Sequence, residues 1–177
     1  LLFAFGDDDT IEVLEQQFAR RFAAFGHRYS VAAISAQSLG SDAVLDDLID
    51  RLAVDHLAWD GQGCLTPRWV FVEGSSQIAQ MLAERAAERL PVCVEQFPAG
   101  PLSDEAAAAR TAWLGETGFS GWSRGGAGWS VAALSGFRGL GPTPPPRSMC
   151  FLPVVDLSEL PILLDPLGPR LQGLSLA

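Results

Sequence analysis

The sequence predicts an α/β fold in which helices are layered on a mostly parallel β-sheet. Short apolar runs rich in β-branched and aromatic residues alternate with longer segments whose apolar residues recur every three or four positions. The 177 residues are 48% hydrophobic and 19% charged, with a mean hydropathy of +0.19, which is typical of globular chains. We therefore expect a single domain with its own hydrophobic core.

The first half of the chain contains three strand-and-helix units. Each helix starts after a small or acidic residue that suits a helix N-terminus. Pro91 is expected to end the third helix, because proline lacks the N–H that would continue the hydrogen-bond ladder. The expected elements are a strand at 1–5 with a helix through Phe22, a strand at 31–35 with a helix at 41–59, and a strand at 68–73 with a helix from Ser75 or Ser76 to Leu90.

The second half is more irregular, because glycine, proline and tryptophan crowd the segment 115–146. A long irregular stretch inside a compact domain is usually functional or mobile. The expected elements are a strand at 92–96, a helix from Ser103 to near Leu114, strands at 129–134 and 148–155, a short helix at 157–164 and a final strand at 171–177.

Composition argues against several classes of protein. The net charge is −9 and the twelve basic residues are all arginine, which disfavours binding to nucleic acid or to an anionic membrane surface. The absence of lysine removes Schiff-base chemistry and the phosphate-binding P-loop. The apolar runs are too short to span a bilayer. The three cysteines lie far apart and only two histidines are present, so we expect neither a metal site nor a disulfide framework.

Cys64 is the candidate nucleophile. It lies in the run GQGCLTP, a glycine-rich loop between an amphipathic helix and a strong strand, where catalytic side chains are commonly presented. Gly63 leaves room for a substrate to approach the sulfur, and the backbone N–H of Cys64 is the candidate donor to an oxyanion. The alternative is that Cys64 is a small buried hydrophobe. Cys93 and Cys150 lie in apolar runs and are interpreted as core residues.

Other polar residues give weaker signals. His56 precedes the Cys64 loop on a helix and His27 follows a helix, but neither spacing favours a direct contact with Cys64. Asp60 and the neighbouring carboxylates are interpreted as solvated ends of helices and strands. Gly6 stands at a turn from strand to helix, where N–H groups could meet the phosphates of a dinucleotide, although three aspartates follow it and would repel them.

Four segments taken together resemble the acyl-CoA reductase (LuxC) family of the aldehyde dehydrogenase superfamily. They are LLFAFGDDDTIEVL, FGHRYSVAAIS, VDHLAWDGQGCLTPRWVFVEG and RLQGLSLA, in this order and spacing. The part GQGCLTPRWVFVEG is the most specific, because members of the superfamily place the catalytic cysteine after a Gly-Gln-like turn and before a strand of this kind.

The resemblance implies a three-layer catalytic domain like that of aldehyde dehydrogenases, covering 1–177 and excised from a larger chain. Residues 1–9 and 171–177 would then be junctions to a missing nucleotide-binding domain. It also implies that Cys64 attacks the thioester of an acyl-CoA or acylated protein, and that NADPH or NADH then reduces the bound acyl group to an aldehyde. Gln62 and Gly63 would shape the loop and Gly6 would mark the cofactor side. We also expect a cytoplasmic homo-oligomer.

One departure from the superfamily bears on the chemistry. Aldehyde-oxidising relatives carry a water-activating glutamate where this chain has Ala24. Loss of that base suits an enzyme whose thioester must avoid hydrolysis. Two other hypotheses remain: Cys64 could serve an acyltransferase or thioesterase with His56 or His27 as base, or the chain could be a non-catalytic oligomerisation or binding module.

Overall fold

The computed structural model describes residues 1–18, 21–141 and 143–177. Short 3₁₀ turns connect several of the elements. The helices and strands are β1 (Leu2–Phe5), α1 (Asp8–Phe18), β2 (Phe22–Phe25), β3 (Tyr29–Ile34), α2 (Asp42–Leu57), β4 (Pro67–Glu73), α3 (Ser76–Gln96), α4 (Asp104–Ser120), β5 (Gly121–Gly126), β6 (Trp129–Leu134), β7 (Ser148–Val154), α5 (Leu160–Leu164) and β8 (Leu171–Leu176).

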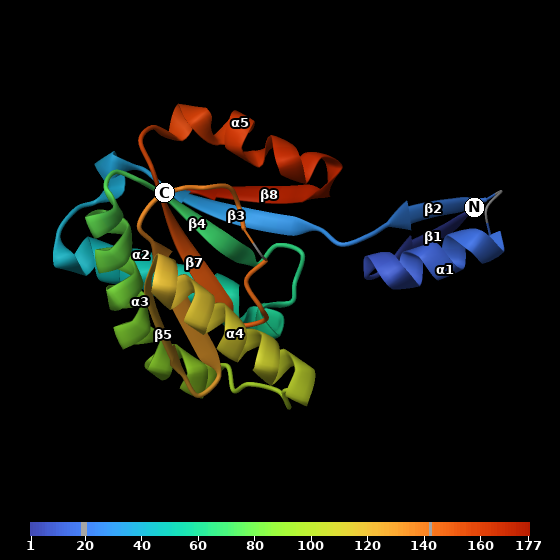
Figure 1. Ribbon diagram of the computed structural model, residues 1–177, viewed down its shortest axis with the longest axis horizontal. Coiled ribbons are helices and arrows are strands. Elements are labelled where there is room, and N and C mark those ends of the chain that lie inside the picture. The colour runs from blue at the N-terminus through green and yellow to red at the C-terminus, as the bar shows by residue number, and fades with distance from the viewer. Residues whose placement is uncertain (19–20, 142) are drawn as a thin grey trace.

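A six-stranded sheet forms the body of the molecule, in the order β5-β6-β7-β4-β3-β8 (Figure 1). All neighbouring strands are parallel except β5 and β6, which form an antiparallel pair. Helices α2 and α3 cover one face, and α4 and α5 contribute to the core on the other. The three-layer α/β architecture predicted from the sequence is therefore confirmed.

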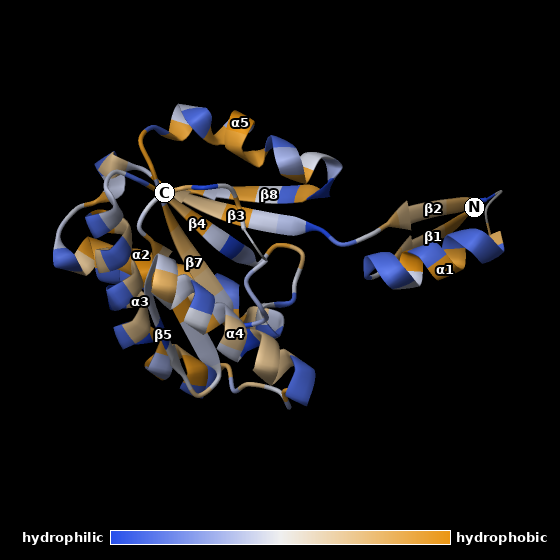
Figure 2. Cartoon of the chain, in the orientation of Figure 1, coloured by the Kyte–Doolittle hydropathy of each residue, from blue (hydrophilic) through white to orange (hydrophobic). Residues whose placement is uncertain are grey.

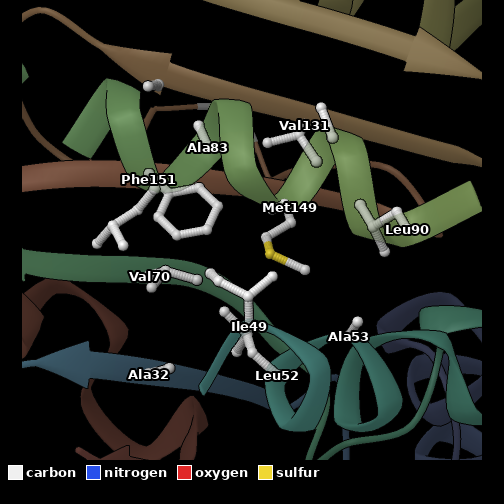
Figure 3. Close-up of a cluster of buried hydrophobic side chains, with 14 of the residues drawn as sticks. Ala32, Ile49, Leu52, Ala53, Val70, Ala83, Leu90, Val131, Met149 and Phe151 are labelled. Carbon is white, nitrogen blue, oxygen red and sulfur yellow. The ribbon is translucent and has the colours of Figure 1, made fainter. Parts of the chain in front are cut away.

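The larger core lies between the sheet and the helices α2 and α3. Figure 3 shows Ile49 of α2 beside Met149 of β7 in the centre of this cluster, to which Leu90 of α3 and Phe151 of β7 also belong. These four side chains are 1% exposed or less. Full burial of large apolar side chains is the main stabilising contribution to such a fold. The sheet is consequently a rigid support for the loops at its edges.

The opposite face of the sheet carries the second core. Trp69 and Phe71 of β4 point to this side, where Trp113 of α4 and Leu160 of α5 complete the cluster. The side-chain nitrogen of Trp69 donates to the carbonyl oxygen of Leu140 at 2.9 Å. This bond fixes part of the glycine-rich segment over the sheet.

Residues 1–18 and 21–25 form a small unit with a sheet of its own, and an ion pair of Asp8 with Arg170 at 3.3 Å connects it to the main body. Strands β1 and β2 pair in parallel as a two-stranded sheet, and α1 connects them (Figure 1). Figure 2 shows both strands in hydrophobic colours, yet Phe3 is 57% exposed and Phe5 is 78% exposed. The expected helix through Phe22 is wrong, because Phe22 begins β2 and extends the ladder to β1. Pairing with β1 outweighs the helical spacing of this residue.

Two further predictions are wrong in the segment after residue 90. Helix α3 continues through Pro91 to Gln96, so 92–96 is not a strand. Leu90 before the proline and Cys93 after it both belong to the buried apolar face of α3. Burial of that face keeps the chain helical. Helix α4 extends to Ser120, and β5 follows it in the segment that was expected to be irregular.

Candidate active site

Cys64 lies in a tight turn that leads into β4. The N–H of Thr66 donates to the carbonyl oxygen of Gly63 at 3.0 Å, so Cys64 and Leu65 occupy the corner of the turn. Ser30 of β3 donates its hydroxyl to the carbonyl oxygen of Cys64 at 2.7 Å. The backbone of the candidate nucleophile is thus fixed to the neighbouring strand, while its thiol is free and exposed.

The other predicted residues of this loop lie beside the thiol. Gln62 is exposed and Gly63 is half-buried. A cavity of about 410 Å³ adjoins the turn, lined by Gly63, Leu65 and Thr66 on one side and by β8 on the other. The backbone N–H of Cys64 donates to none of the residues that the structure describes.

The chain reaches this turn through an uncommon backbone path. Trp59, Asp60 and Gly61 have φ values of 55°, 57° and 67°, all in the left-handed region. This region is disfavoured for residues that carry a Cβ atom. A Cβ added to Gly61 would lie 2.6 Å from the backbone nitrogen of Arg147, so only glycine fits the close approach. This path leads to Cys64 just before the start of β4, which is a central strand of the sheet.

Asp60 is not a solvated helix end, contrary to the expectation. Its Oδ1 accepts hydrogen bonds from Nη1 of Arg147 at 2.8 Å and from the N–H of Gly100 at 3.2 Å. Arg147 is 5% exposed, and its guanidinium also donates to the carbonyl oxygens of Phe97 and Gly128. The sequence signals for this contact were an Asp-Gly pair and one arginine before an apolar strand, 87 positions apart.

Neither histidine meets Cys64. His56 is fully buried, with Nδ1 3.3 Å from the carbonyl oxygen of Pro67, and burial lowers the pKa of its imidazole to about 4. The ring of His27 packs edge-on against Tyr29 with centroids 4.7 Å apart. Desolvation lowers the pKa of His27 as well. Within residues 1–18, 21–141 and 143–177, no hydrogen bond joins either imidazole to the thiol.

The two other cysteines are core residues. Cys93 is 9% exposed in α3 and Cys150 is 3% exposed in β7. Burial raises the pKa of the Cys93 thiol and raises that of Cys150 to about 12. A thiol of such high pKa carries little of the nucleophilic thiolate at neutral pH. Cys64 is the exposed thiol of the three.

Gly6 lies on the other sheet, in the N-terminal unit. Its N–H donates to the carbonyl oxygen of Phe25 at 3.2 Å. The next residue, Asp7, caps α1 by accepting the N–H of Thr10 at 2.7 Å, and this bond lowers the pKa of the Asp7 carboxyl. The start of α1 thus carries negative charge. The N–H groups of Gly6 and Thr10 already donate to acceptors within the protein. This arrangement does not fit the phosphates of a dinucleotide.

Three further findings concern the described residues. Among them, no three His, Cys, Asp or Glu side chains gather to hold a metal ion. Ala24, which the resemblance to aldehyde-oxidising relatives singled out, is an exposed residue of β2. In the part of the chain that the structure covers, no helix has the length and apolar character needed to cross a membrane.

Comparison with known proteins agrees with this architecture. The sequence profile of the acyl-CoA reductase (LuxC) family matches residues 2–176. Among solved structures, the chain is similar to proline utilization A of Bradyrhizobium japonicum, with a TM-score of 0.67 and 14% identity over 98% of this chain and 20% of the other. It is also similar to AldH of Staphylococcus aureus, with a TM-score of 0.68 and 9% identity over 98% and 45% of the two chains.

A third similar structure is the P. syringae indole-3-acetaldehyde dehydrogenase AldA in complex with NAD+ and IAA. Its TM-score is 0.66 with 10% identity, over 98% of this chain and 43% of the other. At such low identity these likenesses establish the fold alone, and the chain spans less than half the length of each solved structure. A comparison with curated proteins finds no match.

Proposed function

Because the chain belongs to the acyl-CoA reductase (LuxC) family, we propose that it supplies the nucleophile of an enzyme that reduces a fatty acyl thioester to the aldehyde. The single observation that carries the proposal is the exposed thiol of Cys64 in a turn whose backbone is fixed by Ser30. The substrate is an acyl-CoA or an acylated protein. The family relation supports an oxidoreductase in general, and the turn supports the covalent route.

The covalent step follows from the geometry of the turn. The thiolate sulfur of Cys64 attacks the carbonyl carbon of the thioester, and the N–H of Cys64 donates to the oxygen as it becomes negative. The bond from that carbon to the sulfur of the donor then breaks, and the donor leaves as a thiolate that takes up a proton. Gly63 has no side chain to obstruct the approach, and Gln62 helps to shape the loop. The product is a thioester on Cys64.

The surroundings favour a thioester that survives until it is reduced. Ala24 offers no carboxylate, and among the described residues neither the imidazole of His56 nor that of His27 forms a hydrogen bond with the thiol of Cys64. Among the described residues neither imidazole is therefore placed to activate a water molecule at Cys64, and the carboxylate that lines the adjoining cavity is that of Asp55. This disfavours an acyltransferase or thioesterase that uses His56 or His27 as its base.

The reductant we propose is a nicotinamide cofactor, NADPH or NADH. The start of α1 at Gly6 does not fit its phosphates, since Asp7 caps that helix and Asp8 and Asp9 follow in its first turn. Gly6 therefore remains a prediction without a supporting contact. We derive no step through the cofactor from these residues.

The proposed partners follow from the surfaces of the N-terminal unit. A two-stranded sheet is marginal by itself, and Phe3 and Phe5 are exposed on it. We propose that residues 1–177 are the catalytic domain of a larger cytoplasmic homo-oligomer, and that residues 1–9 adjoin a nucleotide-binding domain. Residues 171–176, the second proposed junction, form β8 at the edge of the catalytic sheet.

Mass spectrometry of the protein after incubation with a long-chain acyl-CoA, without cofactor, tests the covalent step. We expect one acyl group on the wild type, removed by hydroxylamine, and none on Cys64→Ser. The matched control is the double variant Cys93→Ala/Cys150→Ala, which keeps Cys64 and should be acylated like the wild type.

The outcomes separate the competing hypotheses. Acylation without cofactor, followed by aldehyde formation on addition of NADPH or NADH, supports the reductase. Acylation followed by rapid release of free fatty acid would indicate a thioesterase. An absence of acylation in the full-length protein would refute the nucleophile and favour a binding module.

A further inference from the structure

The strained backbone of the molecule is concentrated at one contact. Three non-glycine residues of the described chain have φ in the left-handed region: Trp59, Asp60 and Arg147. Two of these, Asp60 and Arg147, form an ion pair at 2.8 Å. Disfavoured backbone conformations persist only where the surrounding structure imposes them, and they cluster at functional sites. The contact lies four residues before Cys64.

The guanidinium of Arg147 is anchored by more than this ion pair. Its side chain is 6% exposed, and its three nitrogens reach three separate segments of the chain. Nη1 donates to Asp60, Nη2 donates to the carbonyl oxygen of Phe97 at 2.7 Å, and Nε donates to that of Gly128. Because these segments belong to the end of α3 and to the β5–β6 turn, Arg147 joins the Cys64 turn to the rigid body.

The backbone of Arg147 also limits the turn. Gly61 passes so close that a Cβ atom would lie 2.6 Å from the nitrogen of Arg147. The turn is thus held on one side by Arg147 and on the other by the bond from Ser30 to the carbonyl oxygen of Cys64. Between these two attachments only Gln62 and Gly63 precede the nucleophile.

From these contacts we infer that Arg147, acting through Asp60, is a positioning residue that holds the Cys64 turn in its reactive geometry. The inference rests on the proposed role of Cys64 as nucleophile. Neither side chain touches the reacting atoms. Their effect is to keep the sulfur and the N–H of Cys64 in a fixed relation to an incoming carbonyl, and a misplacement of about 1 Å can cost about 100-fold in rate.

The test compares single-turnover acylation of Cys64 by a long-chain acyl-CoA in variants of the full-length protein. In Arg147→Met we expect the rate at saturating acyl-CoA to fall about 100-fold, while the half-saturating concentration changes less than about twofold. Arg147→Lys keeps the charge but not all three hydrogen bonds, and its acylation rate should be about tenfold higher than that of Arg147→Met. Asp60→Asn should lose about tenfold, and the double variant should be no slower than Arg147→Met.

The matched control is Arg110→Met. Arg110 is a half-buried arginine that, like the buried Arg147, donates to the β5–β6 hairpin; its acceptors are Gly126, Trp129 and Ser130. Its bonds do not reach the Cys64 turn. If Arg147→Met acylates within about twofold of Arg110→Met, the positioning role is refuted. Asp60→Asn serves as the second variant if Arg147→Met does not fold, and an unchanged rate there refutes the role equally.

Hydrogen exchange separates this inference from the proposed function. If the wild type is not acylated by any acyl thioester, the nucleophilic role of Cys64 fails. Exchange of the peptide 58–66 still reports how firmly the turn is held. We expect faster exchange there in Arg147→Met and Asp60→Asn but not in Arg110→Met, and equal exchange in all three would overturn the inference.

Discussion

The turn at Cys64 and the turn at Gly6 contain similar residues but are held in different ways. Each combines glycine with aspartate at the junction of a strand and a helix. At Cys64, Asp60 reaches the buried Arg147, which directly precedes β7 and lies far away in the sequence, and Ser30 holds the carbonyl oxygen of Cys64. At Gly6, Asp7 caps the helix that it precedes. A turn shaped by long-range contacts can keep a reactive geometry, whereas a locally capped one mainly starts a helix.

The largest expected difference is in the cost of removing an aromatic ring from the body that supports the Cys64 turn and from the unit that contains Gly6. Phe71→Ala in β4 removes a fully buried ring and should lower the free energy of unfolding by about 3–5 kcal/mol. Phe3→Ala in β1 removes a ring that is 57% exposed, and should cost under about 0.5 kcal/mol. Urea unfolding at pH 7 measures both. A large cost at Phe3 would mean that the N-terminal unit is packed against something that covers it.

The fold was predictable where local signals agree with the tertiary contacts. Strands such as β4 and β7 are continuous apolar runs, as expected for a parallel sheet buried on both faces. The rule that proline ends a helix failed at Pro91, because the buried face of α3 continues beyond it. Strand β5 has the sequence GWSRGG, which lacks a strand pattern, and forms through its pairing with β6.

The site was predictable only in part, because some of its contacts join residues that are distant in the sequence. Cys64, Gln62 and Gly63 are neighbours in sequence, so a short motif shows them together. The ion pair of Asp60 with Arg147 joins positions 87 apart, so the local signals at the two positions do not show that they meet. The buried state of His56 likewise depends on its contact with Pro67 across the loop.

Acid should lower the free energy of unfolding of the body that supports the Cys64 turn, and the group responsible is His56. Burial holds its pKa at about 4, against an ordinary value of 6.5, so the folded state keeps the imidazole neutral while the unfolded state takes up a proton. The resulting stability is complete above pH 6.5 and is lost as the pH falls towards 4. The loss amounts to about 3 kcal/mol.

Urea unfolding of the wild type and His56→Gln at pH 7, 6, 5 and 4 measures this effect. The variant does not titrate at this position, so its curve should decline less than that of the wild type over this range. His27→Gln is the control, because the imidazole of His27 is only partly buried and its removal should leave most of the dependence. Parallel curves for the wild type and His56→Gln would contradict the prediction.

Substitution of Gly61 and of Gly6 by alanine tests how tightly each turn is constrained. Gly61→Ala places a Cβ in a left-handed residue next to the nitrogen of Arg147, and should cost about 2 kcal/mol. A Cβ at Gly6 would meet Thr10 at 3.6 Å, an ordinary contact, so Gly6→Ala should change stability by under about 0.5 kcal/mol. Thermal unfolding of both variants provides the measurement, and equal losses would show that the turns are not differently constrained.

The smallest expected effect concerns the cap at the Gly6 turn. Asp7→Ala removes the acceptor of the Thr10 N–H, so hydrogen exchange at the start of α1 should become about fivefold faster. Asp9→Ala is the matched control, since it removes a carboxylate from the same helical turn without removing the cap. Exchange near Cys64 should not change in either variant, because the attachments of that turn lie in the body. A change there after loss of the cap would mean that the two turns are coupled, and that α1 helps to shape the site.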